Sequence, residues 1–188
     1  MSNPPKLLVT PTVVADVLII EPKVFGDDRG WFTESFNAQD FAIATGLDVS
    51  FVQDNHSFSR QWTLRGLHYQ LEQTQGKLVR VVAGSVFDVV VDIRKDSSTY
   101  GKWVGVELSA QNHKQLWVPP GLAHGFLVLS EAAEFLYKTT DYYHPQSEAC
   151  LAWNDPIVGI EWPLPTGVQP NMNAKDAAGL NWDKAPKF

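Results

Sequence analysis

The fold is decided by the stretch KLVRVVAGSVFDVVVDIR, residues 77–94, which is rich in valine and contains no proline. A small connection, Ala83-Gly84-Ser85, divides the stretch into two halves and can form a tight turn. In the second half alternate residues share a face: one face holds Phe87, Val89, Val91 and Ile93, and the other holds Asp88, Asp92 and Arg94. The stretch therefore predicts two strands, Lys77–Val82 and Val86–Arg94.

Similar short segments lie on both sides of these two strands and are separated by turn residues such as Asp27-Asp28-Arg29-Gly30. The further predicted strands are Val13–Ile20, Trp31–Phe36, Trp103–Leu108, Gln115–Val118, Gly125–Leu129 and Glu134–Thr140. Many short strands with turns about every ten residues are typical of a β-sandwich or barrel. A parallel, doubly wound sheet is disfavoured because strands and helices do not alternate. The chain also lacks the G-x-G-x-x-G fingerprint of dinucleotide sites.

Helices contribute little to the predicted fold. One helix is expected over Ala38–Thr45, because Asn37 can cap its start and Gly46 can end it. The tail from about Asn154 is rich in proline and tryptophan and predicts irregular structure, with a short helix near Ala174–Leu180. Because no repeat or linker is visible, we expect one all-β domain over residues 1–188, with irregular N- and C-terminal extensions.

The composition excludes several classes of protein. The chain has 188 residues, of which 44% are hydrophobic and 19% charged, so it is neither disordered nor membrane-like. A net charge of −6 without a basic cluster disfavours nucleic-acid binding. No apolar run could span a bilayer, and Met1–Leu8 lacks the apolar core of a secretory leader. With a single cysteine, Cys150, the expected setting is the reducing cytoplasm, without membrane association.

The densest group of candidate functional residues lies between Gln53 and Gln70, in a region that reads as strand. It contains Gln53, Asn55, His56, Arg65, His68, Tyr69 and Gln70. A histidine can act as a base near neutral pH, although a single histidine is more often structural. Strict alternation places Arg65 and His68 on opposite faces. If both reach one pocket, Gly66 must mark a bulge or bend.

Three further positions are ambiguous from the residues alone. Lys77 shares a face with apolar Val79 and Val81, so it either faces inward beside an anionic partner or reaches solvent from the strand end. Tyr137 is by itself more typical of packing than of acid catalysis. Asp176 resembles a surface or helix-start residue, and its spacing alone does not select it.

The segment Trp117–Phe126 contains P-x-G-x-x-H, ending at His124. It resembles the second motif of the cupin superfamily, in which this histidine points into a jelly-roll barrel. Metal-binding cupins also carry H-x-H and a glutamate in their first motif. The corresponding stretch here is His68-Tyr69-Gln70 and lacks the second histidine, so a cupin-like jelly roll without a metal is the better interpretation.

In order along the chain, seven segments together resemble the dTDP-4-dehydrorhamnose 3,5-epimerase family. They are Asp28–Phe36, Gln53–Ser57, Leu64–Gln70, Gln75–Val81, Val118–Phe126, Tyr137–Tyr143 and Lys175-Asp176. The similarity extends from about residue 12 to residue 180. It implies a cupin-type jelly roll and a homodimer whose subunits exchange strands, so that some nucleotide contacts come from the partner.

The resemblance also implies a role for each site residue. His68 would be the base, oriented by Asp176, Tyr137 the acid on the opposite ring face, and Lys77 the group at the sugar carbonyl oxygen. Tyr143 would stack on thymine. The remaining implied substrate contacts are Arg29, Glu34, Gln53, Asn55, Arg65, His124, Glu148 and Lys175. The implied reaction inverts C3 and C5 of dTDP-4-dehydro-6-deoxy-D-glucose in dTDP-L-rhamnose synthesis, and it needs no metal or cofactor.

Other functions remain open at the level of sequence. A related enzyme could epimerise only C3 or only C5, or isomerise the keto group. Two alternatives belong to other classes. One is a metal-dependent cupin oxygenase, which the missing histidine disfavours, and the other is a non-catalytic sugar-binding cupin. Product analysis, metal analysis and deuterium exchange separate these possibilities.

Overall fold

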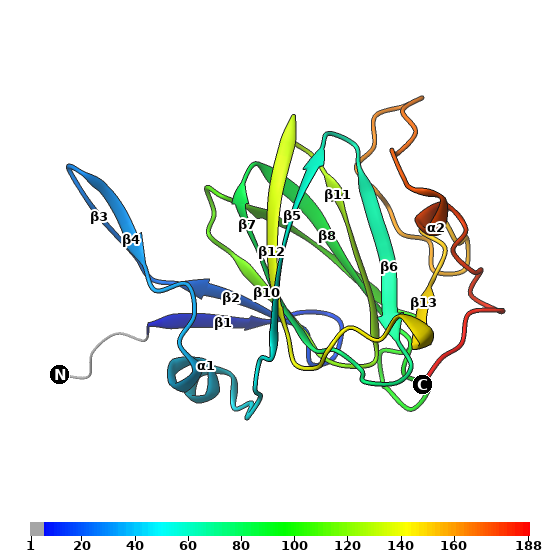
Figure 1. Cartoon of the computed structure of the whole chain (residues 1–188), viewed down its shortest axis with the longest axis horizontal. Coiled ribbons are helices and arrows are strands. Elements are labelled where there is room, and N and C mark those ends of the chain that lie inside the picture. The colour runs from blue at the N-terminus through cyan, green and yellow to red at the C-terminus, as the bar shows by residue number, and fades with distance from the viewer. Residues whose placement is uncertain (1–5) are drawn as a thin grey trace.

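The computed structural model describes residues 6–188, which form two facing antiparallel sheets and a separate hairpin (Figure 1). The six-stranded sheet contains, in order, β1 (Leu7–Pro11), β2 (Leu18–Pro22), β10 (Gln115–Val118), β7 (Lys77–Ala83), β12 (Ala132–Thr139) and β5 (Gln53–Arg60). The five-stranded sheet contains β13 (Glu148–Cys150), β6 (Leu64–Gln70), β11 (Leu122–Val128), β8 (Ser85–Asp92) and β9 (Trp103–Ser109). The predicted all-β class is confirmed.

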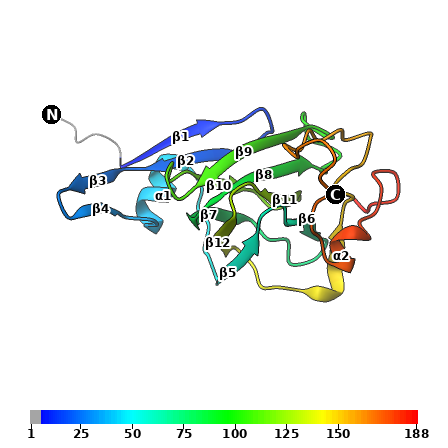
Figure 2. The same cartoon turned by 90° about the horizontal axis from the view of Figure 1, so that it is seen from above.

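The remaining elements lie outside the two sheets. β3 (Val24–Asp27) and β4 (Gly30–Thr33) pair as a hairpin that projects from the body (Figures 1 and 2). The helices are α1 (Ala38–Thr45), a 3₁₀ turn (Pro145–Ser147) and α2 (Ala174–Ala177). No helix in residues 6–188 is long and apolar enough to cross a bilayer. The predicted lack of a leader concerns Met1–Leu8, of which residues 1–5 lie outside the described part.

The prediction for α1 is confirmed in both of its bounds. Asn37 Oδ1 accepts hydrogen bonds from the backbone N–H groups of Gln39 and Asp40, at 3.0 and 3.2 Å. Gly46 ends the helix with φ of 73°, a left-handed conformation that glycine adopts without steric cost. Both signals are local, which is why the sequence alone locates this element.

The predicted strand Val13–Ile20 is wrong over Val13–Val17, whereas Leu18–Ile20 belong to β2. Its first residues form a turn between β1 and β2, closed by a 3.1 Å hydrogen bond from the Thr12 N–H to the Val17 carbonyl oxygen. Val14 and Val17 are buried, so their hydrophobicity reflects packing of the turn rather than strand structure. β1, β3 and β13 were not predicted, and β5 and β6 were predicted only as a region of strand without bounds. The other predicted strands differ from the observed ones mainly at their ends.

Two apolar layers cover the two faces of the five-stranded sheet. The first fills the space between them with inward-facing residues of both sheets, including Val79, Val90, Leu116, Phe126 and Phe135. The second lies on the outer face of the five-stranded sheet, where Val89 and Val91 pack against the C-terminal tail (Figure 2). Both faces of β8 are therefore buried, and its alternate residues Val86, Asp88 and Val90 face the space between the sheets.

Candidate active site

A bulge in β6 brings Arg65 and His68 to the same face. His124 of β11 pairs with His68, whereas Phe126 pairs with Arg65, so β6 carries one extra residue. Gly66 occupies the bulge with φ of +116°, and a Cβ there would lie 2.6 Å from the Gly125 Cα. Directly paired residues share a face, so both side chains point between the sheets, and the predicted bulge is confirmed.

His68 is joined to a carboxylate from the C-terminal tail. Its Nε2 lies 2.6 Å from Asp176 Oδ1, and the Asp176 side chain is only 2% exposed. The α2 turn fixes Asp176, whose backbone N–H donates to Asn173 Oδ1 at 2.8 Å. Because Nε2–H donates to Asp176, the other ring nitrogen, Nδ1, is the proton acceptor. A carboxylate that orients an imidazole in this way also stabilises the imidazolium formed later.

Lys77 lies at the start of β7 and faces inward with Val79 and Val81. Burial lowers the pKa of Lys77 to about 8, although the negative charges of Asp88 and Glu148 oppose the shift. The amino group is therefore mainly cationic at neutral pH. Of the two orientations left open by the sequence, the structure has the inward one with nearby carboxylates.

Near Lys77 lies a buried pair of residues, of which the sequence predicted only His124 as part of the site. His124 Nε2 is 2.9 Å from Asp88 Oδ1, and both residues are buried. Burial lowers the pKa of His124 and raises that of Asp88, and the attraction between the two residues opposes both shifts. Asp88 was not among the predicted site residues, although an aspartate between two apolar inward positions of a central strand was a usable signal.

Tyr137 is the inward phenol of β12. It packs beside Phe135, with ring centroids 6.1 Å apart. Burial raises the pKa of Tyr137, Glu148 raises it further, and Arg65 opposes the shift. The hydroxyl is therefore protonated at neutral pH and can donate a proton to the pocket.

A charged network forms the rim of the pocket. Glu148 Oε2 accepts hydrogen bonds from Tyr143 Oη at 2.6 Å and from Lys175 Nζ at 2.5 Å. Burial opposes ionisation of Glu148, but these two hydrogen bonds hold its pKa below the ordinary value. Tyr143 remains 52% exposed, so its ring can accept a flat ligand from solvent.

Gln53 and Asn55 occupy the inward face of β5, opposite Thr139 and Tyr137 of β12. Gln53 Nε2 donates to Asn55 Oδ1 at 3.0 Å. Within residues 6–188, the buried Asn55 Nδ2 has no hydrogen-bond partner. A buried donor without a partner costs free energy unless a ligand or water satisfies it, so this amide is available to a bound molecule.

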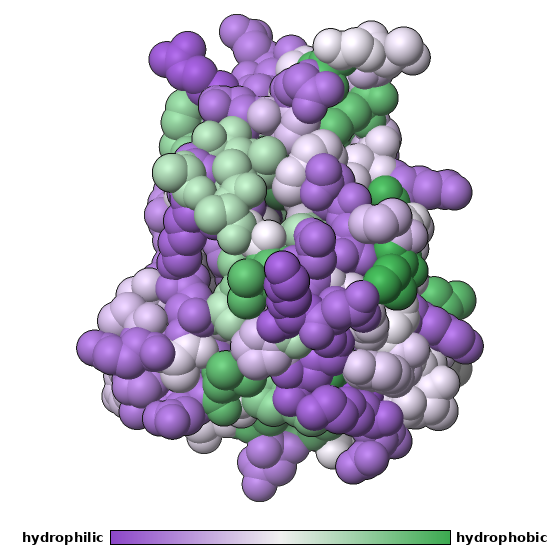
Figure 3. Space-filling view, turned by 90° about the vertical axis from the view of Figure 1, so that its right-hand side faces the viewer, coloured by the Kyte–Doolittle hydropathy of each residue, from purple (hydrophilic) through white to green (hydrophobic). Residues whose placement is uncertain are grey.

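One pocket collects the chemically active side chains. Of the predicted site residues, its lining includes His68, Lys77, Tyr137, Tyr143 and Glu148. Three further predicted residues adjoin this lining. Asp176 is hydrogen-bonded to His68, Lys175 is hydrogen-bonded to Glu148, and His124 pairs with His68 across neighbouring strands. The side of the molecule that carries α2 and the C-terminal tail is a mainly hydrophilic face with scattered hydrophobic residues (Figure 3).

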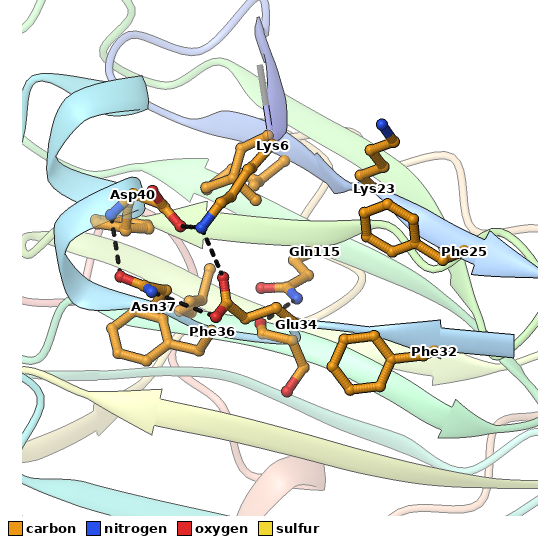
Figure 4. A pocket seen from close by; sticks show the side chains of 14 residues that line it. Lys6, Lys23, Phe25, Phe32, Glu34, Phe36, Asn37, Asp40 and Gln115 are labelled. Carbon is orange, nitrogen blue, oxygen red and sulfur yellow. Dashed lines mark hydrogen bonds and ion pairs between the residues drawn. The ribbon is translucent and has the colours of Figure 1, made fainter. Parts of the chain in front are cut away.

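Arg29 and Glu34 do not join this pocket within one chain. Arg29 lies at the turn of the β3–β4 hairpin and pairs with Asp27 at 2.6 Å. Glu34 lies in a separate cavity at the base of the hairpin, lined by both aromatic and charged side chains, where it interacts with Lys6 and Asn37 (Figure 4). The substrate contacts implied for these two residues remain predictions.

The remaining arrangement of interest is a set of metal-ligand types beside the base. One donor atom each from His68, Cys150 and Asp176 lies within 4.8 Å of the other two. The predicted independence of the reaction from metals and cofactors remains a prediction.

Comparison with known proteins gives a consistent result. A family model described as dTDP-4-dehydrorhamnose 3,5-epimerase matches residues 11–184. A protein of that name from Salmonella typhimurium is 58% identical over 180 residues, covering 95% of this chain and 97% of its own. One from Pseudomonas aeruginosa is 57% identical over 179 residues, covering 95% and 98%.

Solved structures agree with the sequence comparison. The chain is similar to an epimerase from Legionella pneumophila in complex with dTDP-4-keto-L-rhamnose, with a TM-score of 0.92, 50% identity and coverage of 97% and 98% of the two chains. It is also similar to a 3'-monoepimerase from Streptomyces bikiniensis in complex with dTDP-quinovose, with a TM-score of 0.84, 31% identity and coverage of 91% and 86%. The predicted cupin-like jelly roll is confirmed.

Proposed function

The chain belongs to the dTDP-4-dehydrorhamnose 3,5-epimerase family, and from this premise we propose how its own residues perform the reaction. It is an isomerase that converts dTDP-4-dehydro-6-deoxy-D-glucose to dTDP-4-dehydro-L-rhamnose in rhamnose biosynthesis. The observation that carries the proposal is the convergence of one imidazole, one phenol and one ammonium group on a single pocket.

The chemistry requires few groups. The protons on C3 and C5 of the sugar are acidic because both carbons are adjacent to the C4 ketone. Removal of either proton gives an enolate with its charge on O4, and protonation from the opposite face inverts the carbon. The protein must therefore supply a base, a positive charge at O4 and an acid across the ring.

We assign the base to His68. Its 2.6 Å contact with the buried Asp176 fixes the ring and stabilises the imidazolium once a proton has been taken. Lys77 is assigned to O4, because an ammonium group in a water-poor barrel interacts strongly with a developing oxyanion. Asp88 lies behind Lys77 and His124, and its carboxylate favours the cationic form of Lys77 against the cost of burial.

Tyr137 is assigned as the acid, because its pKa is raised and its hydroxyl keeps its proton. For the nucleotide, Arg65 is a bidentate cation suited to the diphosphate, and the exposed ring of Tyr143 can stack on thymine. Gln53, Asn55, Glu148 and Lys175 complete the polar lining, with the buried Asn55 Nδ2 offering an unsatisfied donor. The cytoplasm is the proposed location, as expected for a chain with one cysteine.

Tyr137→Phe tests the acid. We expect net epimerisation to fall by about 10²-fold or more, because the opposite-face proton donor is lost. Exchange of the C3 and C5 protons with solvent should fall less, since the base and the cation remain. The measurement compares product formation with deuterium incorporation by NMR in the same sample. Equal losses in the two rates would remove Tyr137 from this role.

The homodimer is proposed from the hairpin. Phe25, Trp31 and Phe32 are 51%, 63% and 67% exposed on an arm that extends from the body (Figures 1 and 2). A cluster of exposed aromatic residues marks an interaction site. A second copy of the chain that packs against this arm would also bring Arg29 to its partner's pocket, which explains why one chain leaves Arg29 outside.

The combined substitution Trp31→Ser and Phe32→Ser tests the dimer. The unaltered chain should show twice the 21.0 kDa chain mass by light scattering, and the variant should be monomeric with kcat/KM reduced at least about tenfold, given the usual cost of losing buried aromatic contacts. Ile157→Ser, at a residue 60% exposed on the tail, is the matched control. A monomeric unaltered chain, or a dimeric and fully active double variant, contradicts the proposal.

A second candidate function is epimerisation of a single carbon. The similarity to a 3'-monoepimerase, at 31% identity, shows that the same fold is found in an enzyme named for a single centre. The number of inverted centres is decided by product analysis. Family membership favours an isomerase over the oxygenase and the non-catalytic binding protein.

A further inference from the structure

Three different ligand types converge behind the proposed base. His68 lies on β6, Cys150 on β13 and Asp176 on α2, and one donor atom from each lies within 4.8 Å of the other two. Cys150 pairs directly with His68 across the two strands, so both side chains leave the same face of the sheet. An imidazole nitrogen, a thiolate and a carboxylate oxygen are the ligands that Zn²⁺ takes in proteins.

We propose that these three side chains form an inhibitory site for a thiophilic divalent cation such as Zn²⁺ or Cd²⁺. In the proposed reaction His68 and Asp176 act without a metal, so an ion bound here would occupy the base and its carboxylate and would take no part in the chemistry. The inference that occupancy inhibits rests on the function proposed above, whereas the binding itself does not.

The geometry needs only a small adjustment. Tetrahedral Zn²⁺ with bonds of about 2.0–2.3 Å separates its ligand atoms by about 3.3–3.8 Å. His68 Nε2 donates to Asp176 Oδ1 across 2.6 Å, so the cation takes the place of the proton in this hydrogen bond and moves the two groups slightly apart. The side chain of His68 is 28% exposed and lines the pocket, which gives the cation a route from solvent.

The charges and protons balance. Cys150 is a free thiol whose Sγ lies 3.7 Å from the Leu151 carbonyl oxygen, to which it donates its proton before a cation enters. On binding, the Cys150 proton leaves to solvent and the His68 proton moves from Nε2 to Nδ1. The two negative charges of thiolate and carboxylate then match the charge of the cation, as is usual for metal ligands that lose their protons on binding.

Inhibition follows from the same contacts. In the bound form, Nδ1 of His68 carries a proton and Nε2 holds the cation, so neither nitrogen can accept a proton from the sugar. Asp176 no longer orients the ring. The fourth tetrahedral position remains for water.

Cadmium chloride and zinc chloride, added to EDTA-treated full-length protein, test the site. Cd²⁺ should produce an ultraviolet thiolate-to-metal absorption that saturates at one ion per chain, and Cys150→Ser should abolish it. Because Cys150 is the only cysteine of the chain, the absorption has one possible source. The Zn²⁺ concentration that halves the rate should be at least about tenfold lower for the unaltered enzyme than for Cys150→Ser. EDTA should restore the rate of the unaltered enzyme.

Cys150→Ser is the matched control for activity, because the thiol takes no part in the proposed reaction and serine preserves the shape. Without metal, its rate should lie within about twofold of the unaltered enzyme. Absence of the Cd²⁺ absorption in the unaltered chain, or equal Zn²⁺ inhibition with and without the thiol, overturns the proposal. The absorption does not depend on turnover, so it tests the metal site even if the proposed epimerase activity fails.

Discussion

Replacing His68 with asparagine should lower epimerisation by about 10²–10⁴-fold, the usual contribution of a positioned general base. The substitution removes the only group that we assign to proton abstraction, so deuterium should enter neither C3 nor C5 of the sugar at a significant rate. Asparagine keeps a polar group near Asp176, which limits the cost of leaving that buried carboxylate without a partner.

The measurement is solvent deuterium incorporation at the two carbons, followed by NMR, with the unfolding midpoint recorded for both proteins. His56→Asn is the matched control, because His56 lies on the exposed side of β5 and pairs with Glu134 at the surface. The control should exchange both carbons at the normal rate. Normal exchange at both carbons in His68→Asn would show that His68 is not the base.

Lys77→Met should lower kcat by about 10²–10³-fold, the cost of removing one aimed donor from a developing oxyanion. Methionine fills a similar volume without the charge, so the barrel should still pack. Loss of the cation leaves the charge on O4 unopposed in a water-poor site. The exchange of both protons should fall together with the overall rate, because the enolate precedes either product.

The pH dependence gives a second readout for Lys77. Its pKa is lowered to about 8 by burial, and the cationic form is the active one. The rate of the unaltered enzyme should therefore fall as the pH rises through about 8, and Lys77→Met should lack this fall. Lys102→Met, at an exposed lysine before β9, should keep the normal rate and profile. A basic limb that persists unchanged in Lys77→Met would assign it to another group.

Local chemistry explains which parts of the fold were predictable. The cap residues Asn37 and Gly46 located α1 because each acts through hydrogen bonds or backbone conformation within a few residues. The bulge at Gly66 was predicted conditionally. Arg65 and His68 lie on opposite faces of a regular strand, so they can share a face only if the strand bulges between them. By contrast, Val14 and Val17 are buried in a turn, and their pattern could not be distinguished from that of a strand.

The residues of the candidate site also differ in how far the sequence predicts them. His68 lies in a polar cluster that stands out in the sequence, whereas Tyr137 and Asp176 were implied only by the resemblance. Asp176 lies 108 residues from His68, and only the path of the tail brings it there. Asp88 was overlooked because the sequence places it on the polar face of an alternating strand. Other elements cover that face as well, so Asp88 is buried, and the sequence of the strand alone does not show this. Arg29 lies on a hairpin outside this pocket, and the substrate contact that the resemblance implies for it requires the second chain that we propose.

We propose that one base and one acid, on opposite sides of a sugar ring, invert two carbons through two successive enolates, each with its charge on O4. The most direct test is the reaction of the unaltered enzyme with dTDP-4-dehydro-6-deoxy-D-glucose in D₂O, followed by NMR of the product. We predict deuterium at both C3 and C5 and the L-rhamno configuration at both. Deuterium and inversion at one carbon only, or a product formed without deuterium, would contradict the account.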